Sequence, residues 1–126
     1  MMKVLDVGCG TCKFEGAIGM DRLKLPGVDV VTNVEQFPWP FEDNTFERVI
    51  FKHSLSHFHD IVPVMEEVHR ICKPGAIIDI LAPHYTCDNF LTDPTHKISL
   101  GYRSMYYFCT NIKNWKYNIS KFHLRI

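Results

Sequence analysis

The sequence of 126 residues contains no apolar run long enough to cross a membrane. A transmembrane helix needs roughly 20 consecutive apolar residues, and stretches such as AIIDILA at 76–82 are much shorter. No charged segment followed by an apolar one opens the chain, so we expect no signal peptide. The five cysteines are odd in number and do not suit a disulfide framework. We therefore expect reduced thiols and a cytoplasmic protein without a membrane partner.

Acidic residues are absent from the last quarter of the chain. All 14 acids lie within 1–93 together with eight basic residues, which leaves six basic residues and no acid in 94–126. One interpretation is that this basic tail pairs with the acidic body or is solvated. The other is a surface for an anionic substrate or RNA. Because the six charges are widely spread, we do not expect a nucleic-acid partner.

The hydrophobic pattern predicts strands that alternate with few helices. Strands are expected at 3–7, 16–21, 28–33, 46–51 and 76–83. One helix is expected to begin after the cap Asp60, to run through Cys72 and to end at Lys73-Pro74-Gly75. The two prolines of 37–45 predict a loop. A helical turn is expected within 101–108 and edge strands within 115–126. This order is typical of one α/β domain over 1–126 with a mostly parallel sheet.

The first two connections have too little chain for ordinary helices. Nine residues separate Val7 from Ala17, and six separate Asp21 from Val28. A parallel crossover with its helix needs about a dozen residues or more. The sequence therefore predicts a minimal Rossmann-like, doubly wound sheet in which the first crossover helices are shortened or missing. One face of that sheet would be thinly covered, which favours a homo-oligomer.

A glycine turn and an acidic residue follow the first two strands. Glycine lets the backbone approach a ligand closely, and Asp21 at the end of the next strand is placed to accept the hydroxyls of a ribose. Phosphate-binding turns need a third glycine and a helix N-terminus. The chain has Thr11-Cys12-Lys13-Phe14 there instead. The pattern indicates a nucleoside ligand without a phosphate.

Three segments in this order resemble class I S-adenosylmethionine-dependent methyltransferases of the methyltransferase type 11 group. They are VLDVGCG, FPWPFEDNTFERVIF and EEVHRICKPGAIIDI. GCGTCK at 8–13 and DPTH at 93–96 also resemble a reduced branch with a shortened glycine motif. The resemblance implies S-adenosylmethionine as cofactor. It covers about residues 3–108, and FHLRI at 122–126 falls where the family completes an edge hairpin, so a domain truncated at these strands is one interpretation.

The resemblance also implies which residues hold the cofactor. Asp6 would bind its amino group, Asp21 its ribose hydroxyls, and His53 would border the methyl-transfer site. The full set that it implies is Asp6, Gly8, Cys9, Gly10, Asp21, Asn33, Val34 and His53. Among these, Gly8, Cys9 and Gly10 would pass beneath the methionine part, and Asn33 and Val34 would lie near adenine. Asn33 stands where an aspartate is usual in the family, which weakens that contact.

The chain lacks two motifs of enzymes that methylate nucleic-acid bases, and this limits the classes of molecule that could accept the methyl group. Amino-adenine methyltransferases carry a Pro-Pro motif after the fourth strand and cytosine-C5 enzymes commonly a Pro-Cys pair, and neither dipeptide occurs here. We therefore expect methyl transfer to an oxygen or nitrogen of a small molecule. His84 and His96 are the candidate bases, because histidine titrates near neutrality. Each could instead be a structural loop residue. Asp93 could orient His96 or only form the turn before Pro94.

A metal site and a protein without catalytic activity are alternatives to a metal-free methyltransferase. Cys9 and Cys12 form half of a zinc signature, and His53 and His57 are one helical turn apart. No second Cys-x-x-Cys exists, so we expect no metal. A non-catalytic cofactor-binding or scaffold protein of the same fold is the second interpretation. An RNA-associated methyltransferase that uses the basic tail is the third.

Overall fold

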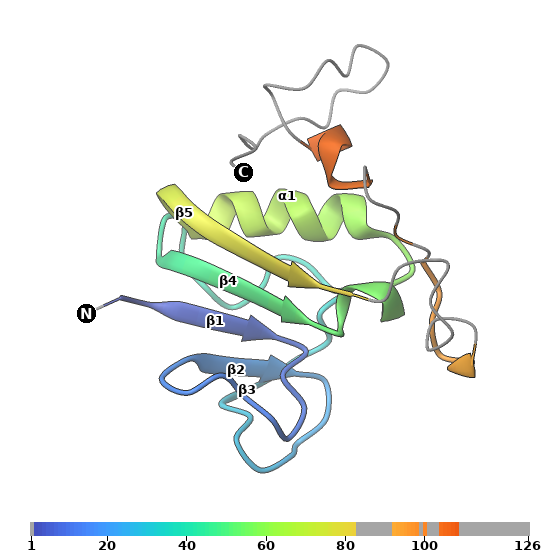
Figure 1. The fold of residues 1–126 in the computed structure, drawn as a ribbon. Helices are drawn as coiled ribbons and strands as arrows, with labels where there is room; N and C mark the ends of the chain where they lie inside the picture. Colours follow the sequence, from blue (N-terminus) through green and yellow to red (C-terminus); the bar gives the residue numbers. More distant parts are fainter. Residues whose placement is uncertain (1, 83–91, 99, 101–103, 109–126) are drawn as a thin grey trace.

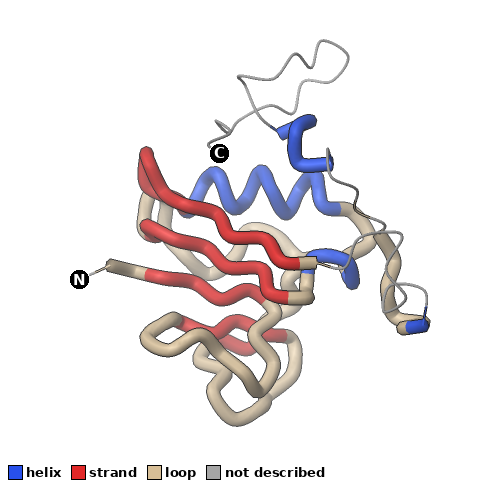
Figure 2. The backbone as a smooth tube through the Cα atoms, viewed as in Figure 1, coloured by secondary structure: helices blue, strands red, loops and turns tan. Residues whose placement is uncertain are grey.

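The computed structural model describes residues 2–82, 92–98, 100 and 104–108, and its centre is a five-stranded sheet (Figures 1 and 2). All neighbouring strands are parallel, and their order is β3-β2-β1-β4-β5. The strands are β1 (Val4–Val7), β2 (Ile18–Asp21), β3 (Val30–Val31), β4 (Phe46–Lys52) and β5 (Cys72–Leu81). The predicted parallel α/β sheet is confirmed.

Helix α1 (Ile61–Ile71) covers one face of the sheet beside β4 and β5 (Figure 1). Asp60 caps the helix as predicted, since its carboxylate accepts a hydrogen bond from the N–H of Val62 at 3.0 Å. The apolar stripe of the helix packs on alternate residues of the strands, where the main core forms. This core includes Leu5, Val7, Val49, Phe51, Val64, Val68 and Ile71.

The opposite face of the sheet carries loops instead of helices. Within residues 2–82, no helix lies before the short 3₁₀ turn η1 (Leu55–His57), so β1, β2, β3 and β4 are joined by loops alone (Figure 2). Val4, Ala17 and Ile50 form a separate small cluster on this face. The prediction that the first crossovers have no room for helices is confirmed.

The two short loops cover β2 by packing against a strand glycine. A Cβ atom at Gly19 would lie 2.7 Å from Sγ of Cys9 and 2.8 Å from Cδ of Lys13. Lys13 also pairs with Asp29 of the second loop at 2.9 Å. The same Asp29 carboxylate accepts the N–H of Gly19 at 2.8 Å. Side chains of the shortened loop thus occupy the space over Gly19, where a longer crossover would place a helix.

Two predicted boundaries are wrong. Strand β5 begins at Cys72, directly after α1, whereas Lys73-Pro74-Gly75 was expected to separate helix and strand. The N–H of Thr45 donates to the carbonyl of Ile71 at 2.7 Å, which brings the helix end to β4. Lys73-Pro74-Gly75 therefore falls in a register irregularity inside the β4–β5 pair. Strand β3 is only two residues long, since it pairs with just the last two residues of β2.

Several expectations concern residues outside the described part of the chain. These are His84, the edge strands at 115–126 and most of the basic tail. The helical turn expected within 101–108 appears as the 3₁₀ helix η2 (Ser104–Phe108). Among the described residues, no helix has the length and apolar character required to span a membrane.

Candidate functional site

The turn after β1 is held against the end of β2 by its own N–H groups. Gly8 and Cys9 donate to the carbonyl of Met20 at 2.7 and 3.3 Å. Gly10 donates to Oδ2 of Asp21 at 2.9 Å. Gly8 and Gly10 have φ values of +68° and +56°, which glycine adopts without strain. Because these three N–H groups are bonded within the protein, the turn does not present them to a phosphate.

Asp21 has acceptor capacity beyond the bonds that it makes. Its Oδ1 accepts the N–H of Leu23 at 3.1 Å, while Oδ2 accepts the N–H of Gly10. An ionised carboxylate has about four acceptor positions, so about two remain on this partly exposed side chain. Two hydroxyl donors on neighbouring carbons match that remaining capacity. The structure thus places Asp21 beside the glycine turn, as the sequence predicted.

Asp6 is a buried carboxylate with an unpaired oxygen. Its side chain lies on β1, and the residue is only 2% exposed. Oδ2 accepts the N–H of Phe14 at 2.9 Å, whereas Oδ1 is buried and has no partner among the described residues. Burial raises the pKa of Asp6, although the Phe14 bond and the charges of Lys52 and Lys13 act in the opposite direction. A buried acceptor without a donor fits a ligand that supplies one, such as an amino group.

The end of β4 closes against the glycine turn. Oγ of Ser54 donates to the carbonyl of Val7 at 2.8 Å. The neighbouring His53 is exposed, has a φ of +59°, and donates its N–H to Leu81 at 2.6 Å. The strand order reverses between β1 and β4, and parallel α/β sheets bind ligands beyond the strand ends at such a point. His53 therefore lies at the expected edge of the site.

Asn33 and Val34 follow β3 beside Asp21. The N–H of Thr32 donates to the carbonyl of Asp21 at 2.9 Å, which brings this segment to the same edge. Asn33 is exposed, and its Oδ1 accepts the N–H of Glu35 at 2.9 Å. Val34 is buried, and its carbonyl accepts the indole N–H of Trp39 at 2.9 Å. Asn33 thus presents a polar group at this edge, and Val34 an apolar one behind it.

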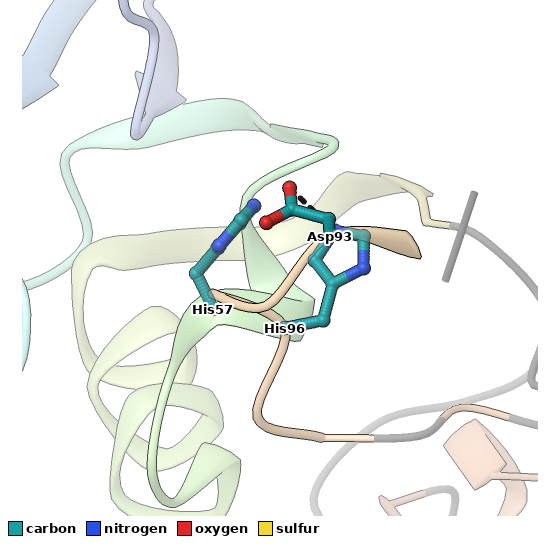
Figure 3. A group of neighbouring side chains, drawn as sticks. All are labelled: His57, Asp93 and His96. Carbon is teal, nitrogen blue, oxygen red and sulfur yellow. Dashed lines mark ion pairs between the residues drawn. The ribbon is translucent and has the colours of Figure 1, made fainter. Parts of the chain in front are cut away.

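A second polar group lies just beyond β4, where His57, Asp93 and His96 meet (Figure 3). The N–H groups of Lys97 and Ile98 both donate to the carbonyl of Ser56, at 2.8 and 3.1 Å. These two bonds hold the segment 92–98 against η1. The sequence predicts His96 as a candidate base and Asp93 as its orienting acid, but it does not predict their contact with His57. That contact depends on segments far apart in the sequence, so no local spacing could have predicted it.

The Asp93–His96 pair has the composition of an oriented base. Oδ2 of Asp93 lies 3.5 Å from Nε2 of His96, whose side chain is only 8% exposed. Hydrogen bonds from the hydroxyl and N–H of Thr95, and then the nearby His96 and His57, lower the pKa of Asp93. The carboxylate therefore stays ionised at neutral pH and can stabilise a proton on His96. The other candidate base, His84, lies outside the described residues.

Comparison with known proteins identifies the family to which this fold and sequence are similar. Residues 14–80 match the model of the family described as "Methyltransferase domain". A demethylmenaquinone methyltransferase of Geobacillus stearothermophilus is 30% identical over an alignment that covers 84% of this chain and 51% of that protein. A SAM-dependent methyltransferase structure from Archaeoglobus fulgidus has a TM-score of 0.70 and 25% identity, and covers 84% of this chain and 57% of that one. The YcgJ protein of Bacillus subtilis shares the fold, with a TM-score of 0.65.

The parallel sheet of order β3-β2-β1-β4-β5 places this protein in the class of Rossmann-like α/β folds. The chain belongs to the methyltransferase domain family, whose model matches more than half of it. It spans about half the length of the curated demethylmenaquinone methyltransferases that it matches.

Proposed function

We propose that this chain binds S-adenosylmethionine and promotes transfer of its methyl group to an oxygen or nitrogen of a small molecule. The observation that carries the proposal is the hydrogen bond from Gly10 to Asp21, which joins the ends of β1 and β2 beside the buried, unpaired Oδ1 of Asp6. A nucleoside with an amino group and no phosphate complements these groups. The family match supports the same reading.

Each predicted cofactor residue has a distinct task in this proposal. Asp21 accepts hydrogen bonds from ribose hydroxyls, and Asp6 accepts one from an ammonium group. Gly8, Cys9 and Gly10 form the turn that the methionine part of the cofactor passes over. A Cβ atom at Gly10 would meet nothing within 4 Å, so the backbone is open to a ligand there. Asn33 and Val34 border the base, and His53 borders the reacting end. The cofactor, when bound, supplies an activated methyl group on its sulfonium.

His96 serves the acceptor side of the proposed reaction. Oriented by Asp93, its imidazole accepts the proton that an acceptor hydroxyl or amine loses on methylation. The pair is suited to this because an ionised carboxylate stabilises the imidazolium that forms. His57 stands beside it, with ring centroids 4.7 Å apart. The protein otherwise contributes alignment, since methyl transfer from a sulfonium needs an in-line approach.

Calorimetric titration with S-adenosylmethionine tests the cofactor site. We expect binding by the intact chain and a loss of about 10- to 100-fold in affinity for Asp21→Asn, because hydrogen bonds to a charged group contribute about 1.5–3 kcal/mol. Asp21→Asn keeps one carbonyl oxygen that can still accept the N–H of Gly10, and it gives up the longer bond from Leu23. Glu15→Gln, an exposed acid in the same loop, is the control and should bind normally. Absence of heat at millimolar ligand would refute the proposal.

Methyl incorporation separates an enzyme from a binding protein of the same fold. Labelled cofactor should transfer its methyl group to small hydroxyl or amine acceptors. Demethylmenaquinone belongs in the panel because relatives carry that name, and transfer to its ring carbon would contradict an oxygen or nitrogen acceptor. His96→Ala should lose incorporation while still binding cofactor. Binding without incorporation into any acceptor would instead support the non-catalytic alternative. If the basic tail binds RNA, affinity should fall steeply with salt.

We also propose that the protein works in the cytoplasm. The three described cysteines, Cys9, Cys12 and Cys72, are free thiols, which is the state that the cytoplasm maintains. Phe14 and Val31, which lie in or beside the first three strands, are 44% and 50% exposed, and this supports a second copy on the thinly covered part of the sheet. Analytical ultracentrifugation of the full chain should find a dimer, and a monomer at all concentrations would refute it.

A further inference from the structure

We infer that His57, Asp93 and His96 form a binding site for a divalent cation of the zinc class. Each residue offers one ligand atom, and these atoms all lie within 4.8 Å of one another. Figure 3 shows the Asp93 carboxylate between the two imidazole rings. The inference concerns metal binding and holds whether or not the chain transfers methyl groups.

His57 is held in the tautomer that a metal ligand needs. Its Nδ1 lies 3.2 Å from the carbonyl oxygen of Thr95 and 3.0 Å from the hydroxyl of the same residue. Because a carbonyl oxygen only accepts, Nδ1 carries the hydrogen, and Nε2 of the neutral ring keeps a free lone pair. Histidine ligands of metals typically donate their other N–H to a carbonyl or carboxylate in this way.

Asp93 is oriented by the same threonine. Its Oδ1 accepts the N–H of Thr95 at 2.9 Å and the hydroxyl of Thr95 at 2.6 Å. These bonds leave Oδ2 directed toward His96, 3.5 Å from Nε2. Ligand atoms about 2.0–2.2 Å from a tetrahedral zinc ion lie roughly 3.3 Å apart. The Asp93–His96 spacing therefore already matches one edge of such a site.

The donor set selects among cations. Two imidazole nitrogens and one carboxylate oxygen suit zinc and similar transition metals, whereas magnesium prefers oxygen ligands and water. Three protein ligands also leave a fourth position, which in zinc sites with three such ligands holds water or a substrate atom. His57 lies on η1, which follows Ser54 at the end of β4, so the cluster lies near the reversal of the strand order.

Metal binding and the base role of His96 exclude each other. With Nε2 bound to a cation, the neutral ring of His96 carries its hydrogen on Nδ1 and cannot accept a further proton, so the base role proposed above belongs to the metal-free protein. The cation would fix η1 to the segment 92–98, in addition to the two backbone bonds that Ser56 accepts. Thr95 is a positioning residue in this account, since it orients both His57 and Asp93 without binding the metal.

Zinc titration of the chelator-treated full chain tests the inference. We expect one zinc ion per chain, with at least tenfold weaker binding in His57→Ala, in Asp93→Asn and in the ligand-sparing Thr95→Val. His69→Ala removes an exposed histidine of α1 and should leave the affinity unchanged. Magnesium should bind much more weakly than zinc. Absence of zinc binding, or equal binding in all variants, would overturn the inference.

Cobalt(II) provides a readout that does not depend on variants folding. A site of two histidines and one aspartate should give visible ligand-field bands without a thiolate charge-transfer band. A strong thiolate band in the wild-type protein would place the metal on one or more of the five cysteines and would overturn the inference. Circular dichroism of each variant checks that a loss of binding is not a loss of folding.

Discussion

A Cβ atom at Gly8 would lie only 2.7 Å from the Cβ of Ser54. The turn after β1 and the end of β4 therefore approach as closely as their atoms allow. The bond from Oγ of Ser54 to the carbonyl of Val7 fixes the same contact from the other side. Glycine is therefore needed at position 8 for two reasons, the positive φ and the close packing of the two strand ends. The strand ends of the sheet thus set the position of the turn.

Alanine substitutions at the two glycines of the turn should differ in cost. Both have positive φ, which costs a residue with a Cβ about 1–2 kcal/mol. Gly8→Ala must also displace the backbone around Ser54, and such overpacking adds about 1–3 kcal/mol. Gly10→Ala meets nothing within 4 Å and should show only the first effect. Urea unfolding measures both, and equal losses would contradict the close contact.

The two serines after β4 form a second matched pair. Oγ of Ser54 donates to Val7, whereas the buried Oγ of Ser56 has no partner in the described part of the chain. Ser54→Ala should lower the free energy of unfolding by about 1 kcal/mol, the usual net contribution of a hydrogen bond. Ser56→Ala removes an unpaired buried hydroxyl and should be neutral or stabilising. Thermal unfolding compares them, and a larger loss for Ser56→Ala would show that its hydroxyl is bonded.

Much of the fold could be predicted because local patterns decide it. The apolar period after Asp60 gave α1 its limits within a residue, and the short gaps after Val7 and Asp21 excluded helices there. The predicted start of β5 is wrong because a tertiary contact determines where the strand begins. The bond between Thr45 and Ile71 pulls the helix end onto β4, and a local turn signal at Lys73-Pro74-Gly75 does not reveal this.

The two parts of the site were predictable to different degrees. Gly10 and Asp21 follow neighbouring parallel strands, whose ends meet at one edge, so their contact follows from topology alone. The position of His57 beside Asp93 depends on Ser56 accepting bonds from a distant segment. From the sequence alone, Lys13 is only the last residue of the GCGTCK motif. In the structure, its side chain covers Gly19 and pairs with Asp29, and it holds the shortened loop in place.

Glu67 should be the acid on which stability depends most. It is buried, and its carboxylate accepts two bonds from Arg70, at 2.6 and 2.8 Å, and one from the N–H of Trp39. Glu67→Gln should lower the free energy of unfolding by about 2–3 kcal/mol, because bonds to a charged group are replaced by weaker ones and Arg70 keeps only the more exposed Asp43 as an ionised partner. The neighbouring Glu66→Gln is exposed and should change little.

The pH dependence of this effect has a defined sign. The hydrogen bonds from Arg70 lower the pKa of Glu67 below the ordinary value of 4.5 for this side chain. Its stabilisation is therefore present above that value and is lost as the pH falls through the lowered pKa. Urea unfolding should show a large difference between wild type and Glu67→Gln at neutral pH and a small one in acid. A difference that grows in acid would contradict the assignment.

Asp6 should show the opposite sign, because burial raises its pKa above the ordinary value of 3.8 for this side chain. The folded state then favours the protonated form, so the contribution of Asp6 to stability is present below 3.8 and is lost as the pH rises through the raised pKa. Asp6→Asn carries no such titration. The melting temperature of Asp6→Asn should therefore rise relative to wild type as the pH is raised from acid to neutral, while its affinity for S-adenosylmethionine falls at neutral pH. Thermal unfolding and calorimetry on both proteins measure this, with Glu15→Gln as control. A constant difference in melting temperature across the titration would contradict the raised pKa of Asp6, and unchanged cofactor affinity would show that the unpaired Oδ1 has no part in binding.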